Sequence, residues 1–378
     1  MPHSLNLKGK TRHALLIGNV ASIQFLRFIA AALVVFDHSA LALSHHASWA
    51  ISSGFLENAQ FGASGVHIFF VISGFIMVYT SFQRKNDVGF STMRFLTRRF
   101  VRIYPIYFFY CALYVLFYHQ MFSVSYLSLP DLVGALLLLP GYSQKIIGQG
   151  WTLAYEVYFY LCFGIVMIVG LKRGLFILTA FFLGSVLLRS VVDVSYPVAF
   201  VCTSSLLLEF LFGAWIAYAV LSGVRMPGAL ALAMVVIGLV GYAAGFVLGF
   251  SRLPSMLTWG VPSALLVGGL VFIESNAKLP SLIQRWSFLG DSSYSLYLLH
   301  VVLIDALIEL VLRTTPGLIG LMSQHGSLGT LALCCFLIGY CTLVSFGAYQ
   351  IFERTIHRRL RDCLTNKPRT VVSKREIA

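Results

Sequence analysis

The sequence predicts an all-α fold, a polytopic membrane bundle of about ten transmembrane helices with both termini in the cytoplasm. Three observations predict it. Hydrophobic residues make up 58% of the 378-residue chain, charged residues 11%, and the mean hydropathy is +0.84, which leaves too little polar surface to coat a soluble globule. The apolar residues form runs near the length of about 20 residues that crosses a bilayer. Lys and Arg fall mainly in the short connections between these runs, which is a topology signal.

Ten runs are long enough to be read as spans. They lie at 23–43, 64–82, 104–122, 151–170, 174–191, 199–222, 227–250, 256–273, 288–312 and 327–352. The run at 131–140 is too short to cross and is expected in a connection. We therefore expect a cytoplasmic segment at 1–22, a transmembrane domain at 23–352 and a basic cytoplasmic tail at 353–378.

The distribution of positive charge orients the bundle. With the N-terminus in the cytoplasm, the inside segments carry 22 Lys and Arg residues and the outside segments carry 4. This asymmetry predicts a multi-pass protein of the bacterial inner membrane with both termini inside. The net charge of +13 is then explained by topology, so the partner is the lipid bilayer and no nucleic acid is expected. No metal-like spacing is present, and the seven Cys residues are expected to be reduced.

Ionisable residues at bilayer depth are candidates for function. Arg27 and His38 stand eleven residues apart in the first run, which is three helical turns plus roughly 20°, so they share one face. Arg27 is expected near the cytoplasmic end and His38 in the outer half. Two structural alternatives stay open, namely snorkelling of Arg27 to the headgroups and a helix–helix hydrogen bond for His38.

Three further ionisable residues join this set. Glu156 is expected roughly 8 Å below the outer surface, at the depth of His38, where it would orient the imidazole; a structural ion pair is its alternative. His300 also reaches the outer half of its span, and Glu209 lies near mid-depth. For both of these, a structural role and a role in the site are equally compatible with the sequence.

The connection at 83–103 is rich in Arg. Arg98 and Arg102 stand four residues apart beside Arg99, so the first two share a face of any short interfacial helix. Guanidinium groups in such a cluster suit phosphate oxygens. The alternative is a plain topology signal that also binds anionic lipid.

Five sequence blocks resemble the integral-membrane acyltransferase-3 family, especially its exopolysaccharide O-acetyltransferase members. They are IQFLRFIAAALVVFDHSA, which holds Arg27 and His38, GVHIFFVISGFIM with Ser73, RRFVRIYPIY with Tyr104, GWTLAYEVYFYL with Glu156, and SYSLYLLH, which ends at His300. Thr152 stands where Ser is usual in the fourth block. The blocks occur in the family's order from residue 23 to 300.

The resemblance implies a ten-helix bundle that takes acyl groups from cytoplasmic acyl-CoA, acetyl-CoA above all, to a hydroxyl on a polysaccharide or lipid-linked glycan. It implies that Arg27 and His38 are essential and that Arg98, Arg99 and Arg102 handle the donor. Ser73, Tyr104, Glu209 and His300 are candidate supporting residues. Acyl-CoA is a substrate, so no bound cofactor is expected. The polysaccharide assembly machinery is a candidate partner.

The resulting hypothesis is that the acyl-CoA thioester reaches His38 from the cytoplasm and that His38, oriented by Glu156, acts as general base on the acceptor. A transient acyl-histidine is an alternative route. A secondary transporter or flippase would also place Arg, His and Glu inside a bundle, although no internal repeat is visible. A sensor or scaffold of a polysaccharide export complex is a third possibility.

Overall fold

The computed structural model describes most of the chain and consists of helices and their connections. The described residues are 20–46, 53–83, 91–122, 127–191, 193–248, 254–277, 279–315, 317 and 326–365, and none of them forms a strand. The N-terminal segment up to residue 19 and the tail beyond residue 365 lie outside this set, as do Arg84 and Lys85 of the predicted basic connection.

Within the described residues, ten helical segments are long and apolar enough to cross a membrane. Their main helices are α2 (Ala21–His46), α4 (Ser64–Gln83), α5 (Thr92–Phe122), α7 (Gly150–Val166), α8 (Leu171–Leu188), α10 (Leu206–Leu221), α11 (Gly228–Leu248), α12 (Val261–Ser275), α14 (Ser293–Thr314) and α16 (Gly326–Ala348). Every predicted span overlaps one of them. The prediction of an all-α, ten-span bundle is confirmed, and its orientation in the membrane stays a prediction.

Short helices lie between the long ones or extend them. They are α3 (Ser53–Ala59), η1 (Gln60–Ala63), α6 (Leu129–Leu136), η2 (Met167–Val169), α9 (Pro197–Cys202), η4 (Met256–Gly260), α13 (Ser281–Trp286), η5 (Ser287–Ser292), η6 (Tyr349–Glu353) and α17 (Arg354–Thr365). The run at 131–140 forms only α6 and a turn, too short to cross, as predicted. The first part of the basic tail is helical, as α17.

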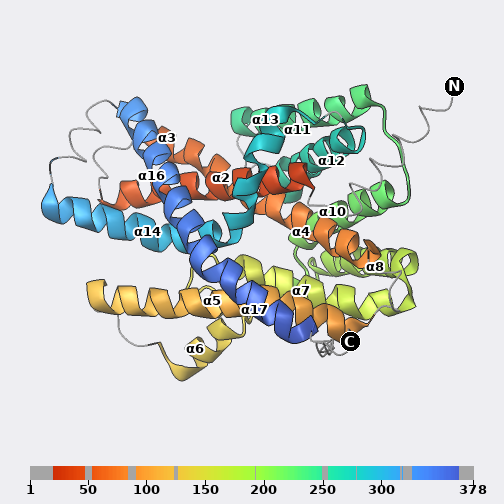
Figure 1. Cartoon of the computed structure of the whole chain (residues 1–378), viewed down its shortest axis with the longest axis horizontal. Helices are drawn as coiled ribbons and strands as arrows, with labels where there is room; N and C mark the ends of the chain where they lie inside the picture. Colours follow the sequence, from red (N-terminus) through yellow and green to blue (C-terminus); the bar gives the residue numbers. More distant parts are fainter. Residues whose placement is uncertain are drawn as a thin grey trace, which may run out of the picture.

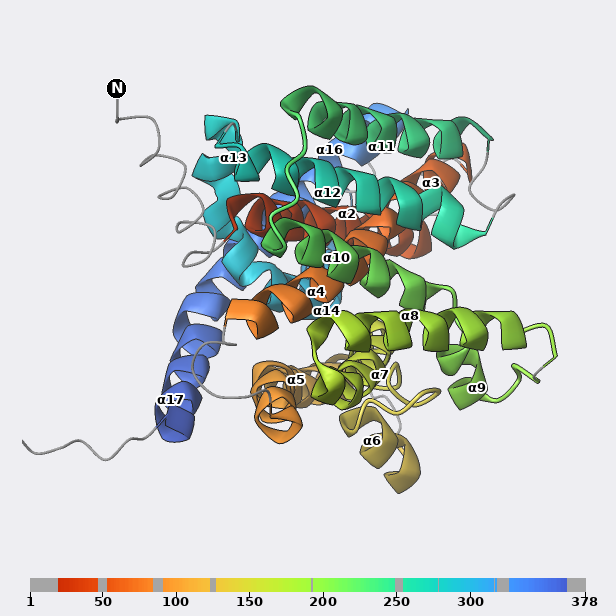
Figure 2. The same cartoon turned by 90° about the vertical axis from the view of Figure 1, so that its right-hand side faces the viewer.

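In Figure 2, α8, α11 and α12 run across the view between two ends of the bundle. In Figure 2, α13 and α17 lie at the left end, and α3 and α9 lie at the right end. Figure 1 shows α16 crossing the outside of the bundle and leading into α17. Helix α2 occupies the interior, where it packs against α4, α12, α14 and α16. Residues on α2 are therefore surrounded by protein from several sides.

Helices α4 and α10 cross at very short range because each presents a glycine to the other. A Cβ added at Gly74 would lie 1.8 Å from the carbonyl oxygen of Phe210, and one at Gly213 would lie 1.7 Å from that of Val71. Small residues that let backbones touch are a common device of membrane helix packing. The contact fixes α4, which carries Ser73 and His67, against α10, which carries Glu209.

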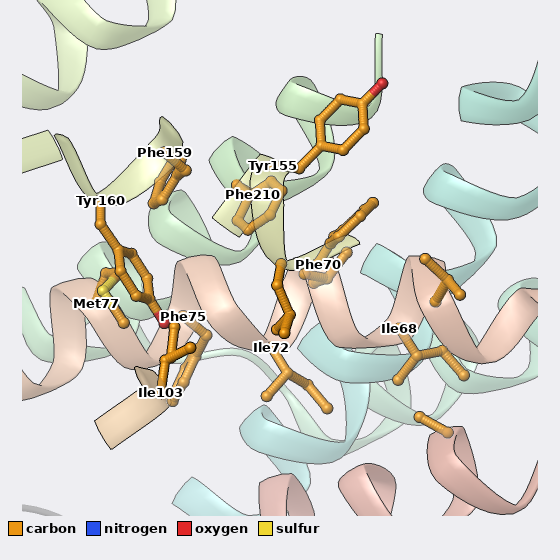
Figure 3. Close-up of a cluster of buried hydrophobic side chains, with 14 of the residues drawn as sticks. Ile68, Phe70, Ile72, Phe75, Met77, Ile103, Tyr155, Phe159, Tyr160 and Phe210 are labelled. Carbon is orange, nitrogen blue, oxygen red and sulfur yellow. The ribbon is translucent and has the colours of Figure 1, made fainter. Parts of the chain in front are cut away.

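Aromatic side chains fill the space around this crossing. Phe70 of α4 stacks on Phe210 with ring centroids 4.7 Å apart, and Phe210 stacks on Phe159 of α7 at 4.6 Å (Figure 3). All three are buried. Stacked pairs of this kind add to the area that they bury, so the faces of α4, α7 and α10 are held in a fixed arrangement.

The start of α2 is held by a carboxylate from another helix. Glu274, at the end of α12, accepts hydrogen bonds from the backbone N–H groups of Ala21 and Ser22 at 2.8 and 2.9 Å, and from the Ser22 hydroxyl at 2.6 Å. The first N–H groups of a helix have no partner within the helix, and an anion there is stabilised by the helix dipole. This cap anchors the helix that carries Arg27 and His38.

Candidate active site

The two residues of the first motif lie on one uninterrupted helix. Helix α2 includes both Arg27 and His38 without a break, so eleven residues of rise separate them by roughly 16 Å along the axis. The helical geometry predicted for the pair is confirmed. Their side chains lie in different surroundings, which are described in turn.

His38 has one ring nitrogen engaged by its own helix. Its Nδ1 donates a hydrogen bond to the carbonyl oxygen of Val34 at 2.9 Å, and the Asp37 carboxylate lies 4.0 Å from the same nitrogen. Because Nδ1 carries the proton, Nε2 of the neutral ring holds a lone pair. The side chain is 32% exposed. A neutral ring with its proton on Nδ1 is the tautomer that a general base acting through Nε2 requires.

His300 of α14 packs directly against His38. The two rings meet edge to face with centroids 4.9 Å apart. His300 is fully buried, and its Nδ1 donates to the Leu296 carbonyl oxygen at 3.2 Å. Its Nε2 lies 3.2 Å from the side-chain nitrogen of Gln149. The structure thus joins two histidines that stand 262 residues apart in the sequence.

A cavity of about 90 Å³ opens between α2, α4, α5, α7 and α14. Its polar lining is supplied by Arg27, Ser73, Arg102, Thr152, Glu156, Tyr160, Ser293, Tyr294 and Tyr297. Apolar lining residues include Ile72, Met77 and Ile103, which are labelled in Figure 3 together with Tyr160. A largely apolar cavity with a few convergent polar groups is the common form of a small-molecule site.

Glu156 lies in this cavity and is not the orienting partner of His38. Its carboxylate accepts hydrogen bonds from the Ser73 hydroxyl at 2.7 Å and from the Tyr160 hydroxyl. The described contact of the His38 Nδ1 proton is the Val34 carbonyl. The predicted Glu156–His38 pairing is therefore wrong, and Glu156 belongs to the half of the site that contains Arg27.

The error comes from the depth at which α7 begins. Gln149, immediately before α7, touches His300, which places the start of α7 at the level of the histidine pair. Ser143 and Ile147 ahead of it are also buried, so the chain enters the bundle before the helix starts. Seven residues further on, Glu156 lies roughly 10 Å deeper.

Arg27 is surrounded by groups of both signs. It donates to the side-chain oxygen of Gln24 at 2.9 Å, and Gln24 donates to Asp291 at 2.7 Å. Arg102, Glu353, Asp291 and Glu156 all contribute to the electric field at its guanidinium. The hydrogen-bond partner of this half-buried cation is thus a neutral amide, and the nearby carboxylates act on its charge through the electric field.

The arginine cluster lies on a transmembrane helix and not in a connection. Helix α5 begins at Thr92 and continues through Pro105, twelve residues earlier than the predicted span. Arg98 is exposed, Arg102 is half-buried and lines the cavity, and the four-residue spacing puts both on one face. The prediction that they share a helical face is confirmed, with the helix longer than expected.

Arg99 and Tyr104 point elsewhere. Arg99 is buried, donates to the Thr80 hydroxyl and has its guanidinium carbon 5.4 Å from the Phe95 ring centroid, so it ties α5 to α4. The Tyr104 hydroxyl donates to the Leu137 carbonyl oxygen at 3.2 Å. Neither lines the cavity. The contacts of both residues connect helices.

Glu209 forms a separate buried pair with a histidine that the sequence reasoning missed. His67 Nδ1 lies 2.7 Å from Glu209 Oε1, and both residues are buried. The His67 ring stacks on Trp259 with centroids 5.9 Å apart. Glu209 does not line the cavity. A signal was available, since His67 is an ionisable residue inside the predicted span 64–82.

A hydrogen-bonded link joins the cavity to the histidine pair. Thr152 and Tyr297 both line the cavity, and their hydroxyls are 2.8 Å apart. The Thr152 hydroxyl also donates to the Gln149 carbonyl oxygen at 2.9 Å, and the Tyr297 ring centroid lies 6.1 Å from that of His300. One residue layer therefore separates the cavity from His300 and His38.

No group that suggests a metal centre is found among the residues that the structure describes, since these contain no cluster of three or more His, Cys, Asp or Glu side chains able to hold an ion. The charged chemistry of the site comes from Arg27, Arg102 and Glu156 on one side and from the two histidines on the other.

Comparison with known proteins agrees with these features. Residues 20–349 match the acyltransferase domain family. The chain is 32% identical over 307 residues to the exopolysaccharide production protein ExoZ of Rhizobium meliloti, covering 79% of this chain and 91% of that protein. No solved structure matches. The matched region contains Arg27, His38, Arg102, Glu156 and His300, and the chain belongs to the acyltransferase-3 family of multi-pass membrane acyltransferases.

Proposed function

We propose that the protein is an O-acyltransferase of the bacterial inner membrane that moves an acyl group, acetyl in the first instance, from cytoplasmic acyl-CoA to a hydroxyl of an extracytoplasmic or lipid-linked polysaccharide. The observation that carries the proposal is His38, whose Nδ1 donates to the Val34 carbonyl oxygen and so leaves Nε2 as the basic nitrogen, on the same helix as the cavity cation Arg27. The similarity to a protein of exopolysaccharide production supports a polysaccharide as acceptor.

The donor enters at α5. Its phosphates bind Arg98 and Arg102, which share one helical face, because guanidinium groups pair with phosphate oxygens through two hydrogen bonds. The uncharged pantetheine arm lies in the cavity beside Arg27, and the thioester approaches the Thr152–Tyr297 link. The pantetheine arm must span the distance from Arg27 to His38, which is a rise of roughly 16 Å along α2. The Thr152–Tyr297 hydrogen bond opens for the thioester to pass.

The chemical step is an acyl transfer without a redox change. The acceptor hydroxyl attacks the thioester carbonyl carbon as His38 Nε2 removes the hydroxyl proton. The new C–O bond forms, the C–S bond breaks, and the CoA thiolate takes the proton back from the imidazolium. The products are the glycan ester and free CoA. The Val34 carbonyl keeps the Nδ1 proton in place throughout.

Glu156 takes a different role from the one expected from the sequence. Held by Ser73 and Tyr160, it balances part of the positive charge of Arg27 and Arg102 across the cavity. The neutral pantetheine and thioester then occupy a space of low net charge, and the phosphates meet Arg98 and Arg102 in the first part of α5.

The test is acyl transfer by the purified protein in lipid nanodiscs with acetyl-CoA and de-esterified polysaccharide. Both the release of free thiol and the formation of ester are followed. We expect His38→Gln to lower the rate by about 100- to 10,000-fold, the usual contribution of a general base. His45→Gln is the matched control, because His45 is an exposed residue of the same helix, and it should retain the wild-type rate.

Two results would count against the proposal. Wild-type rates in His38→Gln would remove the imidazole from the chemistry. Absence of thiol release by the wild-type protein, with transport of a glycan across a sealed membrane instead, would identify a flippase.

A further inference from the structure

Gln149 is an uncharged residue that connects the cavity to the histidine pair. Its backbone carbonyl accepts the Thr152 hydroxyl at 2.9 Å and the Tyr297 hydroxyl at 3.4 Å. Its side-chain nitrogen lies 3.2 Å from His300 Nε2. The residue is 4% exposed. The side-chain contact can be altered by substitution while the backbone contacts remain.

The hydrogen bonds around His300 select one tautomer. The Leu296 carbonyl oxygen can only accept, so His300 Nδ1 carries a proton. The Gln149 amide nitrogen can only donate, so the facing Nε2 must offer its lone pair. With a proton on Nε2 as well, two donors would face each other inside the protein. The arrangement therefore fits a neutral ring with its proton on Nδ1.

We propose that Gln149 is a positioning residue that holds His300 as the neutral Nδ1–H tautomer and so keeps an uncharged ring against His38. The role of this contact in catalysis rests on the proposed function. Two adjacent imidazoles do not readily carry positive charge together. By donating to Nε2, Gln149 leaves His38 as the ring of the pair that receives the proton from the acceptor.

Other titratable groups near the pair do not replace this contact. Asp37 lies beside His38 Nδ1. Tyr297 packs its ring near His300, and the Cys341 thiol of α16 lies 3.9 Å from the His300 carbonyl oxygen. These groups contact His38, or the ring face and backbone of His300, whereas the Gln149 amide faces Nε2 itself.

The tautomer is measured directly by ¹⁵N NMR of the full-length protein labelled at its 10 His residues in lipid bilayers, with the His300 signals assigned by their loss in His300→Gln. In the wild type, His300 Nε2 should give the signal of an unprotonated nitrogen. In Gln149→Glu, a carboxylate replaces the donor by an acceptor of the same shape, so Nε2 should become protonated while Nδ1 keeps its proton on the Leu296 carbonyl oxygen. Gln284→Glu, at an exposed glutamine of α13, should leave the His300 signals unchanged.

Kinetics supply a second readout. Gln149→Met removes the donor without adding charge, and it should lower kcat roughly tenfold, the loss expected for one buried hydrogen bond, with KM for acyl-CoA unchanged. In a His300→Phe background the same substitution should have no further effect, because Gln149 acts through His300.

A protonated Nε2 in the wild type, or an unchanged His300 spectrum in Gln149→Glu, would overturn the inference whether or not the protein transfers acyl groups. Additive effects of Gln149→Met and His300→Phe on kcat would overturn it as well. A wild-type protein that shows the expected tautomer but transfers no acyl group would refute the proposed function and leave the assignment of the tautomer standing.

Discussion

Arg102 is the cation through which the donor proposal can be tested quantitatively. It is half-buried, lines the cavity and lies one helical turn beyond the exposed Arg98. A hydrogen bond to a charged group contributes about 1.5–3 kcal/mol, and every 1.4 kcal/mol corresponds to about tenfold in affinity. We therefore expect Arg102→Gln to weaken acyl-CoA binding by roughly 10- to 150-fold.

Arg98→Gln should have a much smaller effect. Exposed charge pairs are weakened by water and salt and contribute little, so a loss of a few-fold is expected, which shrinks further at high salt. Arg173→Gln is the control, since Arg173 is an exposed cation at the start of α8 on the side of the membrane to which the charge distribution assigns the cluster. It should bind acyl-CoA as the wild type does.

The assay is isothermal titration calorimetry with a non-hydrolysable acyl-CoA analogue, at low and at high salt, on protein in nanodiscs. Unchanged affinity in Arg102→Gln would refute the assignment of the donor site. An effect of Arg98→Gln equal to or larger than that of Arg102→Gln would show that the phosphates bind at the surface and not at the mouth of the cavity.

Three predictions concern stability, each measured by thermal unfolding in detergent. Gly213→Ala should destabilise by about 1–3 kcal/mol or more, because its Cβ would lie 1.7 Å from the Val71 carbonyl oxygen; an unchanged midpoint would show that α4 and α10 separate freely. Glu274→Ala should lower the free energy of unfolding by about 0.5–2 kcal/mol, because it uncaps α2. An unchanged midpoint would show that the cap contributes nothing to stability. His67→Leu should cost about 3–5 kcal/mol, since it leaves Glu209 buried without its partner. His67→Leu/Glu209→Leu should recover most of that loss, and equal losses would argue against coupling.

The helices were predictable because a bilayer imposes a simple length rule on apolar runs. All ten predicted spans correspond to helices of the structure. The start of α5 was not predicted, because hydropathy cannot show a helix that continues into charged residues. In the structure this helix runs on from Thr92 through Pro105.

The relative position of two site residues was predictable when both lie on one helix. It was much less predictable when they lie on different helices. The apolar run predicted one helix for Arg27 and His38, and the helical period predicted that they share a face of it. The depth of Glu156 could not be predicted in the same way. Counting from the end of an apolar run assumes that the helix begins at the membrane surface. In the structure, Gln149, which precedes α7, already touches His300. Depth along one helix gives no information about which groups on other helices lie nearby.

Gln149 and His67 show two further limits of sequence reasoning. Gln149 is an uncharged residue in a connection, and only the packing of α7 against α14 makes its amide a partner of His300. His67 stood in a motif whose resemblance to the family accounted for the segment as a whole. Its pairing with Glu209 across 142 residues depends on the close α4–α10 crossing.

The proposed mechanism requires donor and acceptor to reach His38 from opposite faces of the membrane. It is tested most directly in sealed proteoliposomes, with the face carrying Arg98 and Arg102 assigned by protease access and with membrane-impermeant acetyl-CoA and a soluble polysaccharide each confined to one side. We predict ester formation when acetyl-CoA is on the arginine face and the polysaccharide is on the other, and none when the two are exchanged. Equal ester formation in both arrangements, or formation only when both substrates share one face, would contradict the account.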